Sequence, residues 1–144
     1  MGVRHYNPDD NVLIAMGITV KEFAKGSFIK ASWSEDDFVT EQGHHGSIIR
    51  AKVPNAIVEV TCTLMQGSPS NEELSNARNS DYRDGAGAAA GSIVDTNGTT
   101  SLSAPTTYVK KMPDLGLGSE VEAVEWTFIF AGVGDAVIGT NRLV

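Results

Sequence analysis

The sequence has little of what disulfide-stabilised, membrane-spanning or nucleic-acid-binding proteins require. Cys62 is the one cysteine, so no intramolecular disulfide can form and an oxidising compartment is not implied. Eleven basic residues face 18 acidic ones, which leaves a net charge of −7, and only Lys110 and Lys111 are adjacent. Such scattered bases provide no clustered surface for gripping phosphates. The apolar runs are all far shorter than the roughly 20 residues that span a bilayer, so we expect no membrane segment.

Sequence motifs for catalysis are also scarce. The chain contains no G-x-S-x-G elbow, and its glycine pairs lack the strand and helix context of a phosphate-binding loop. We interpret His44-His45 as part of a turn, because adjacent side chains on a strand point to opposite faces and would not meet at one metal ion. Cys62 is expected to be a small buried hydrophobe. We therefore predict no catalytic residue, no cofactor and no metal site.

What the sequence does contain is strand-like alternation. In residues 56–64, Val58, Val60 and Cys62 point one way, and Glu59 and Thr61 point the other, as on a strand with one apolar face. Residues 120–131 place Val124, Trp126, Phe128 and Phe130 on one face. Asn97-Gly98 is typical of a tight hairpin turn. Further strands are expected at residues 11–20 (interrupted at Gly17), 27–33, 47–52, 92–95, 99–102 and 106–111.

The remaining segments predict one helix and several loops. Ser70 and Glu73 have the spacing of a capping box, which predicts a helix over residues 70–80 with Ser70 as its N-cap. We expect a polar N-terminal arm at residues 1–10, a polar loop at 34–46, a flexible Gly/Ala segment at 84–92 and an irregular tail. The length fits one domain, residues 1–144. The predicted fold is mainly β: an antiparallel sandwich or open barrel with one flanking helix.

Acidic residues gather in the segment SEDDFVTEQG. Glu35, Asp36, Asp37 and Glu41 could supply a carboxylate pair for acid–base catalysis, which needs surroundings that separate the two pKa values. The polar neighbours provide no such surroundings, so we interpret these acids as a solvated surface.

Three stretches of the chain resemble the tail tube proteins of contractile-tailed bacteriophages. They read KGSFIKASWSEDDFVTEQGHHGSIIRAKVPNAIVEVTCTL, GSPSNEELSNA and VEWTFIFAGVGDAVIGTN. The shared pattern is a strand, an acidic segment, a short glycine turn, two strands, a helix start of the form SPxNxxL, and a late W-x-F strand followed by small residues. The similarity covers most of residues 11–141.

The resemblance implies a non-enzymatic virion protein, assembled in the bacterial cytoplasm, whose hexameric rings stack into the inner tail tube. It implies contacts with sheath, baseplate, tail-terminator and tape measure proteins, and passage of viral DNA through the lumen without binding. Residues 34–46 would contact the adjacent ring. Because like charges repel, Glu35, Asp36, Asp37, Glu41 and Glu59 become candidates for an acidic lumen or a ring–ring contact.

Two alternatives stay open. Within the same class, the chain could be the tube protein of a related contractile injection or type VI-like system, or a tube-end adaptor. From a different class, a small enzyme or ligand-binding β-barrel would need polar residues that converge in a pocket, and the sequence indicates no such set.

Overall fold

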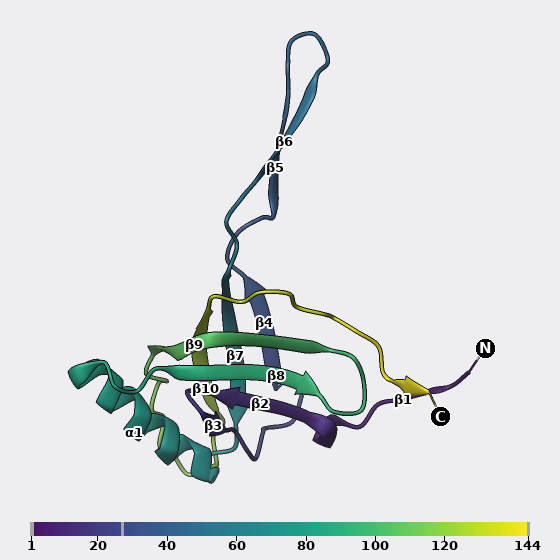
Figure 1. Cartoon of the computed structure of the whole chain (residues 1–144). Coiled ribbons are helices and arrows are strands. Elements are labelled where there is room, and N and C mark those ends of the chain that lie inside the picture. Colours follow the sequence, from purple (N-terminus) through teal and green to yellow (C-terminus); the bar gives the residue numbers. More distant parts are fainter. Residues whose placement is uncertain (1, 27, 144) are drawn as a thin grey trace.

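The computed structural model describes residues 2–26 and 28–143, so the predicted place of Ser27 on its strand lies outside the described residues. Within these ranges the chain is mainly antiparallel β with one α-helix, as predicted (Figure 1). The elements are β1 (Arg4–His5), the 3-10 helix η1 (Pro8–Asp10), β2 (Asn11–Ala15), β3 (Ile18–Thr19), β4 (Ile29–Trp33), β5 (Phe38–Gln42), β6 (Ile48–Lys52), β7 (Ile57–Leu64), α1 (Pro69–Asp84), β8 (Ala89–Asp95), β9 (Ser101–Lys111), β10 (Val124–Ala131) and β11 (Arg142–Leu143).

The main sheet of the described chain has seven strands in the order β3-β2-β8-β9-β10-β7-β4 and no closed barrel. In Figure 1, β2, β8 and β9 run across the view whereas β4, β7 and β10 run upright, so one sheet folds over on itself. The long strand β9 serves both halves: its first part pairs with β8 and its second part with β10. Register shifts on both sides of β9 mark bulges, which bend strands and allow such a corner.

The core lies between the two halves of the sheet. Strands β7 and β10 pair in register from Val124 opposite Leu64 to Ala131 opposite Ile57, and their inward residues are fully buried. The alternation predicted for both strands is therefore confirmed. The inward side chains are Val58, Val60, Cys62, Leu64, Trp126, Phe128 and Phe130.

Thr107 fixes the corner of the sheet. Its hydroxyl accepts a hydrogen bond from Met16 N (2.7 Å) and donates one to the Ala89 carbonyl (2.8 Å), and the residue is fully buried. Beside it, a Cβ on Gly91 would lie 2.6 Å from the Ile14 carbonyl oxygen and 2.7 Å from Thr107 Cγ2. The close approach of β2, β8 and β9 therefore requires glycine at this position.

The helix α1 starts one residue before the predicted range and ends at Asp84. The predicted N-cap, Ser70, is wrong: Ser68 is the cap, and Pro69 occupies the first turn, where a missing N–H costs nothing. The Ser68 hydroxyl accepts from Ser70 N (3.3 Å) and donates to the Lys21 carbonyl (2.6 Å). Ser70 is instead buried, and its hydroxyl accepts from Lys21 N (2.9 Å).

Replacing the cap tests this assignment. We expect Ser68→Ala to lower the free energy of unfolding by about 1–2 kcal/mol, because a buried cap hydroxyl loses both of its partners. Urea-induced unfolding followed by circular dichroism measures the loss. The matched control is Ser75→Ala, whose hydroxyl bonds only the Asn71 carbonyl within the helix. Equal losses for both variants would contradict the capping role of Ser68.

Three other predictions are corrected by the structure. Residues 34–46 are not a loop, because Phe38–Gln42 pairs with Ile48–Lys52 as a hairpin that projects from the top of Figure 1. Residues 84–92 are not flexible throughout: Gly85 ends the helix in the left-handed conformation, and β8 begins at Ala89. The tail is not irregular throughout, because β11 pairs with β1.

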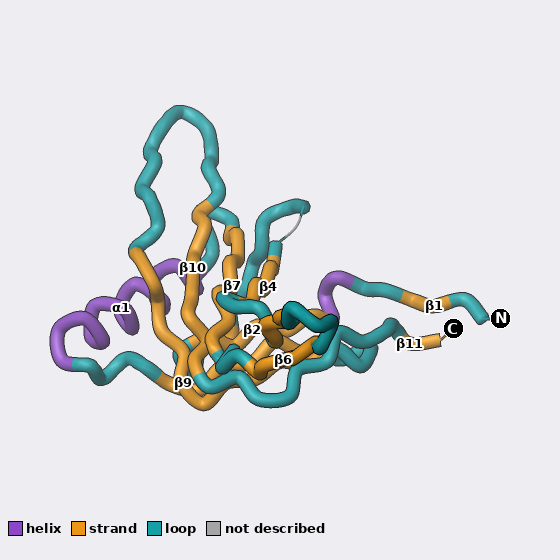
Figure 2. Tube along the Cα trace, turned by 90° about the horizontal axis from the view of Figure 1, so that it is seen from above, coloured by secondary structure: helices purple, strands orange, loops and turns teal. Residues whose placement is uncertain are grey.

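The boundaries of two late strands also differ from the prediction. The two strands predicted at 99–102 and 106–111 are one strand, β9 (Ser101–Lys111), and the last long strand begins at Val124 rather than at residue 120. The chain between β9 and β10 is consequently a long loop, residues 112–123 (Figure 2).

Candidate assembly surfaces

The predicted acidic residues do not gather in one place. Glu35, Asp36 and Asp37 lie at the base of the hairpin, where Asn55 Nδ2 donates to Asp37 Oδ1 (2.9 Å) and Glu35 N donates to Asn55 Oδ1 (3.2 Å). Glu41 lies within β5, opposite Ile49. All four are exposed. These four residues therefore lie along the hairpin and its base, whereas Glu59 lies on the main sheet.

Glu59 lies on the outer face of the main sheet. Its carboxylate forms an ion pair with Lys110 Nζ at 3.0 Å, and both side chains are about half exposed, at 42% and 53%. The same face of β4, β7, β10 and β9 carries Lys30 and Glu125, which the strand register places opposite Thr61 and Thr63. It also carries Lys111, opposite Thr127. This outer face is therefore mostly polar, carries both signs of charge, and includes the apolar Ile57 and Ile129.

The edge of this sheet half is open. In the part of the chain that the structure describes, β4 pairs with β7 alone and ends the sheet. Its apolar residues Ile29, Ala31 and Trp33 are only half-buried, although they pack against the core. A strand with one unpaired edge and half-buried apolar side chains is a template for pairing with another chain.

The hairpin formed by residues 38–52 is the most exposed part of the fold. Every residue of β5 and β6 is exposed, although Phe38, Val39, Ile48 and Ile49 are large and apolar. The Arg50 guanidinium carbon lies 4.1 Å from the centroid of the Phe38 ring, as in a cation–π contact. As predicted, His44 and His45 lie in the turn.

The sequence prediction missed a second exposed apolar segment. Leu115, Leu117 and Val121, in the loop of residues 112–123, are each more than three-quarters exposed (84%, 76% and 78%). Beneath this loop lies a cleft of about 490 Å³, lined by Met112, Trp126 and neighbouring residues. The sequence feature that could have indicated this exposed segment is LGLG, residues 115–118, in which leucines alternate with glycines outside any strand.

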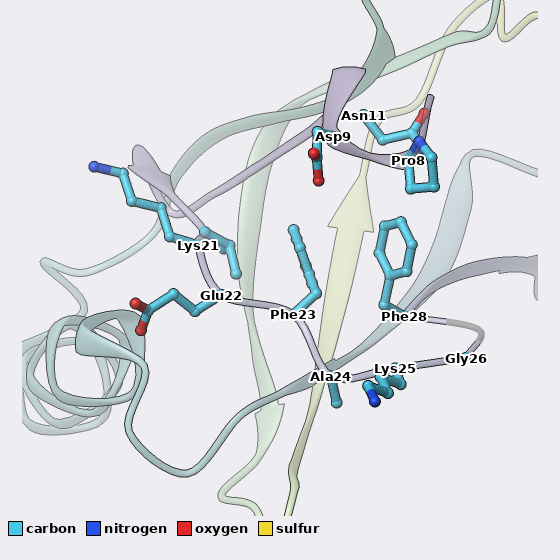
Figure 3. Close-up of a pocket in the computed structure, with 11 residues that line it drawn as sticks. Pro8, Asp9, Asn11, Lys21, Glu22, Phe23, Ala24, Lys25, Gly26 and Phe28 are labelled. Carbon is cyan, nitrogen blue, oxygen red and sulfur yellow. The ribbon is translucent and has the colours of Figure 1, made fainter. Parts of the chain in front are cut away.

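Other pockets are lined in part by charged residues, and one of about 630 Å³ includes Glu35, Asp36 and Asp37. The one in Figure 3, about 590 Å³, lies between η1 and the segment before β4; Phe23 and Phe28 point toward Pro8 and Asp9, whereas Lys21 extends away. Among the residues in the described ranges, no group of three or more His, Cys, Asp or Glu side chains could hold a metal ion. Within the same ranges, no helix combines the length and hydropathy that crossing a membrane requires.

Cys62 is buried, as the sequence predicts. Burial, and to a smaller extent the carboxylate of Glu125, raises the pKa of its thiol to about 12. The thiolate is the reactive form of cysteine, so this side chain is inert at neutral pH.

Comparison with solved structures finds chains of similar architecture. A tube-terminating cap of an anti-feeding prophage superposes with a TM-score of 0.58 at 13% identity, over 95% of both chains. A sheath/tube terminator of PVC, an extracellular contractile injection system, gives 0.60 at 13% identity, over 99% of this chain and 96% of that one. A chain of the PVC sheath–tube complex gives 0.62 at 14% identity, over 88% of both. This chain has a contractile-tail tube-like fold.

The amino-acid sequence alone shows less of this similarity than the fold does. No protein-family model matches the chain. No curated protein matches it either. The contractile-tail tube-like fold is thus recognised through the arrangement of its strands, and the resemblance drawn from the sequence is confirmed at the level of fold.

Proposed function

We propose that this chain is a non-enzymatic structural subunit that assembles with copies of itself into hexameric rings, and that the rings stack into the tube of a contractile tail or injection particle. The observation that carries this proposal is the open edge of β4 beside a polar, uncovered sheet face. Lateral pairing of that edge with the next subunit would cover it and continue the sheet around a ring.

In this arrangement the outer face of β4, β7, β10 and β9 lines the lumen. Its charges are of both signs and nearly balance, with three lysines against two glutamates, so a passing polymer such as DNA meets only weak net attraction. They are Lys30, Lys110, Lys111, Glu59 and Glu125. Glu35, Asp36, Asp37 and Glu41 then lie at the rim or between rings. Cryo-electron microscopy of assembled tubes tests this orientation directly, and a lumen formed by helix α1 would contradict it.

Electron microscopy of the purified protein over a range of concentrations tests the function itself. We expect rings with six-fold symmetry and, at higher concentration, stacked tubes; a monomer at every concentration would refute the proposal. The proposed partners are sheath, baseplate, terminator and tape measure proteins of the same particle, a phage virion or a related injection system.

A terminator at the end of the tube is the second candidate. Two of the similar structures are a cap and a terminator, and they cover 95% and 99% of this chain, compared with 88% for the sheath–tube chain. The same images separate the two roles, because a terminator forms single rings that do not elongate.

A further inference from the structure

The sequence contains a single Asn-Gly pair, Asn97-Gly98, in the loop of residues 96–100 between β8 and β9. Glycine has no Cβ, so nothing on this residue shields its backbone nitrogen from the side-chain amide of the preceding asparagine. That nitrogen can attack the amide carbon, which makes an asparagine before glycine the most prone to lose its side-chain nitrogen as ammonia. The pair therefore carries a reactive chemistry that forming a turn does not use.

The C-terminal segment, residues 137–142, lies against this loop. Figure 1 shows the segment running past the loop on its way to β11. Arg142 N donates a hydrogen bond to the Asn97 carbonyl (2.9 Å), and Thr99 N donates one to the Thr140 carbonyl (3.1 Å). The backbone on both sides of the reactive pair is therefore held in place by the C-terminal segment.

The reacting nitrogen itself is also restrained. Gly98 N donates to the Asp95 carbonyl (3.2 Å), and a Cβ on Gly98 would overlap the Thr140 carbonyl oxygen, so this peptide has little room to rotate. Asn97 N donates to Asp95 Oδ1 (3.0 Å), which places a largely buried carboxylate beside the pair. Attack requires a deprotonated Gly98 nitrogen, and a neighbouring negative charge disfavours that anion. The closed fold thus protects the pair.

We propose that Asn97 is a deamidation site whose reaction is gated by the C-terminal segment. When the segment lifts from the loop, hydroxide from the solvent takes the Gly98 amide proton. A bond forms between Gly98 N and Asn97 Cγ, the Cγ–Nδ2 bond breaks, and the leaving nitrogen takes up a proton and departs as ammonia. Water then opens the cyclic imide at either carbonyl. The net reaction consumes water, releases ammonia, and leaves aspartate or isoaspartate at position 97.

The isoaspartate product would prevent the segment from closing again. Its backbone runs through the former side chain, which inserts a methylene between Asn97 N and Gly98 N. The two anchors of the loop, at Asp95 and at the Thr140 carbonyl, then no longer fit the chain between them. The new carboxylate also lies beside Asp95, and like charges repel. A transient opening of the segment would thereby become a lasting one.

Gly139 provides a way to open the segment. A Cβ on Gly139 would overlap Thr99 Oγ1, so Gly139→Ala should lift the segment, whereas an added Cβ on Gly134, in the matched control Gly134→Ala, meets no described atom within 4 Å. The full-length variants and the native chain are incubated at mildly alkaline pH, which favours loss of the Gly98 amide proton. Mass spectrometry of the peptide that contains Asn97 follows the conversion.

The rate of conversion should follow the population of the open state. We expect Gly139→Ala to react about tenfold faster than Gly134→Ala and the native chain, and the native chain unfolded in urea to react faster still. Equal rates for the two variants would overturn the gating by the C-terminal segment. Equal rates for the folded and the unfolded native chain would show that the fold gives no protection. No conversion in urea would mean that Asn97 is not a deamidation site.

Thr107→Val separates local opening from global unfolding. It removes two hydrogen bonds farther along β9 and leaves the C-terminal segment untouched. We expect Thr107→Val to accelerate conversion less than Gly139→Ala does. Equal acceleration by the two variants would assign the reaction to global unfolding and refute the gate. These measurements need no assembly, so their outcome is independent of the ring proposal.

Hydrogen exchange tests the consequence of conversion. In the closed fold, Ser101 N donates to the Val137 carbonyl (2.9 Å) and Val137 N donates to the Ser101 carbonyl (2.8 Å). The isoaspartate form, isolated by ion-exchange chromatography, should exchange these two amides about tenfold faster than the native chain. The control Asn97→Asp adds the charge without the methylene and should retain more protection. Native protection in the isoaspartate form would show that the segment closes over the product, and would overturn the lasting opening.

Discussion

Replacing Trp126 by alanine is expected to lower the free energy of unfolding by about 3–5 kcal/mol. The indole is 1% exposed, stacks on Phe128 with ring centroids 6.3 Å apart, and donates from Nε1 to Asn71 Oδ1 at 2.9 Å. The substitution therefore removes a large side chain from the core, opens a cavity and breaks the bond that ties β10 to α1. Urea-induced unfolding, monitored by circular dichroism, measures the loss.

Tyr82→Ala provides the control for this experiment. Tyr82 is 81% exposed on α1, so its removal should change stability by no more than about 0.5 kcal/mol. Trp126→Phe keeps an aromatic ring but removes the donor to Asn71, and should fall between the two. A Trp126→Ala loss near zero would mean that this side chain does not lie in the core.

Thr107→Val is expected to cost about 2–3 kcal/mol, although it preserves the shape of the side chain. Valine cannot accept from Met16 N or donate to the Ala89 carbonyl, so the corner between β2, β8 and β9 loses both of its hydrogen bonds. Met16 has φ of 55°, a conformation that few non-glycine residues adopt, and depends on this bond.

The neighbouring Thr106→Val is the matched control, because Thr106 is exposed. We expect it to change the urea midpoint only slightly. Hydrogen exchange gives an independent measurement, since the amide of Met16 should exchange faster in Thr107→Val than in Thr106→Val. Equal stability of the two variants would contradict the role of the Thr107 hydroxyl.

The sequence could predict those elements whose form is decided locally. Strands β7 and β10 each bury one face, so alternation from Val58 and from Trp126 identifies them. The sequence also predicts the helix, but it places the helix start too late. Ser70 and Glu73 have the spacing of a capping box, whereas Pro69 occupies the actual first turn.

The remaining elements depend on contacts between distant residues. Strand β5 buries neither face, so no hydrophobic period marks it, and only pairing with β6 makes it a strand. The small residues around Gly91 are typical of a flexible linker in composition. In the fold they instead allow close packing against Ile14 and Thr107. The pairing of Arg4 with Leu143 joins opposite ends of the chain. The sequence indicates the candidate assembly surfaces only in part, because strand pairing is what places residues 112–123 at the opposite end of the sheet from the hairpin.

The hairpin and the loop of residues 112–123 lie at opposite ends of the sheet, and this has a consequence for polarity. In the proposed tube every subunit would point its hairpin toward the same end, so the two ends would present different surfaces. Each added ring would reproduce the same two surfaces. A factor that starts such a stack and a factor that stops it would then recognise different surfaces, and repetition of the subunit would not by itself define a length.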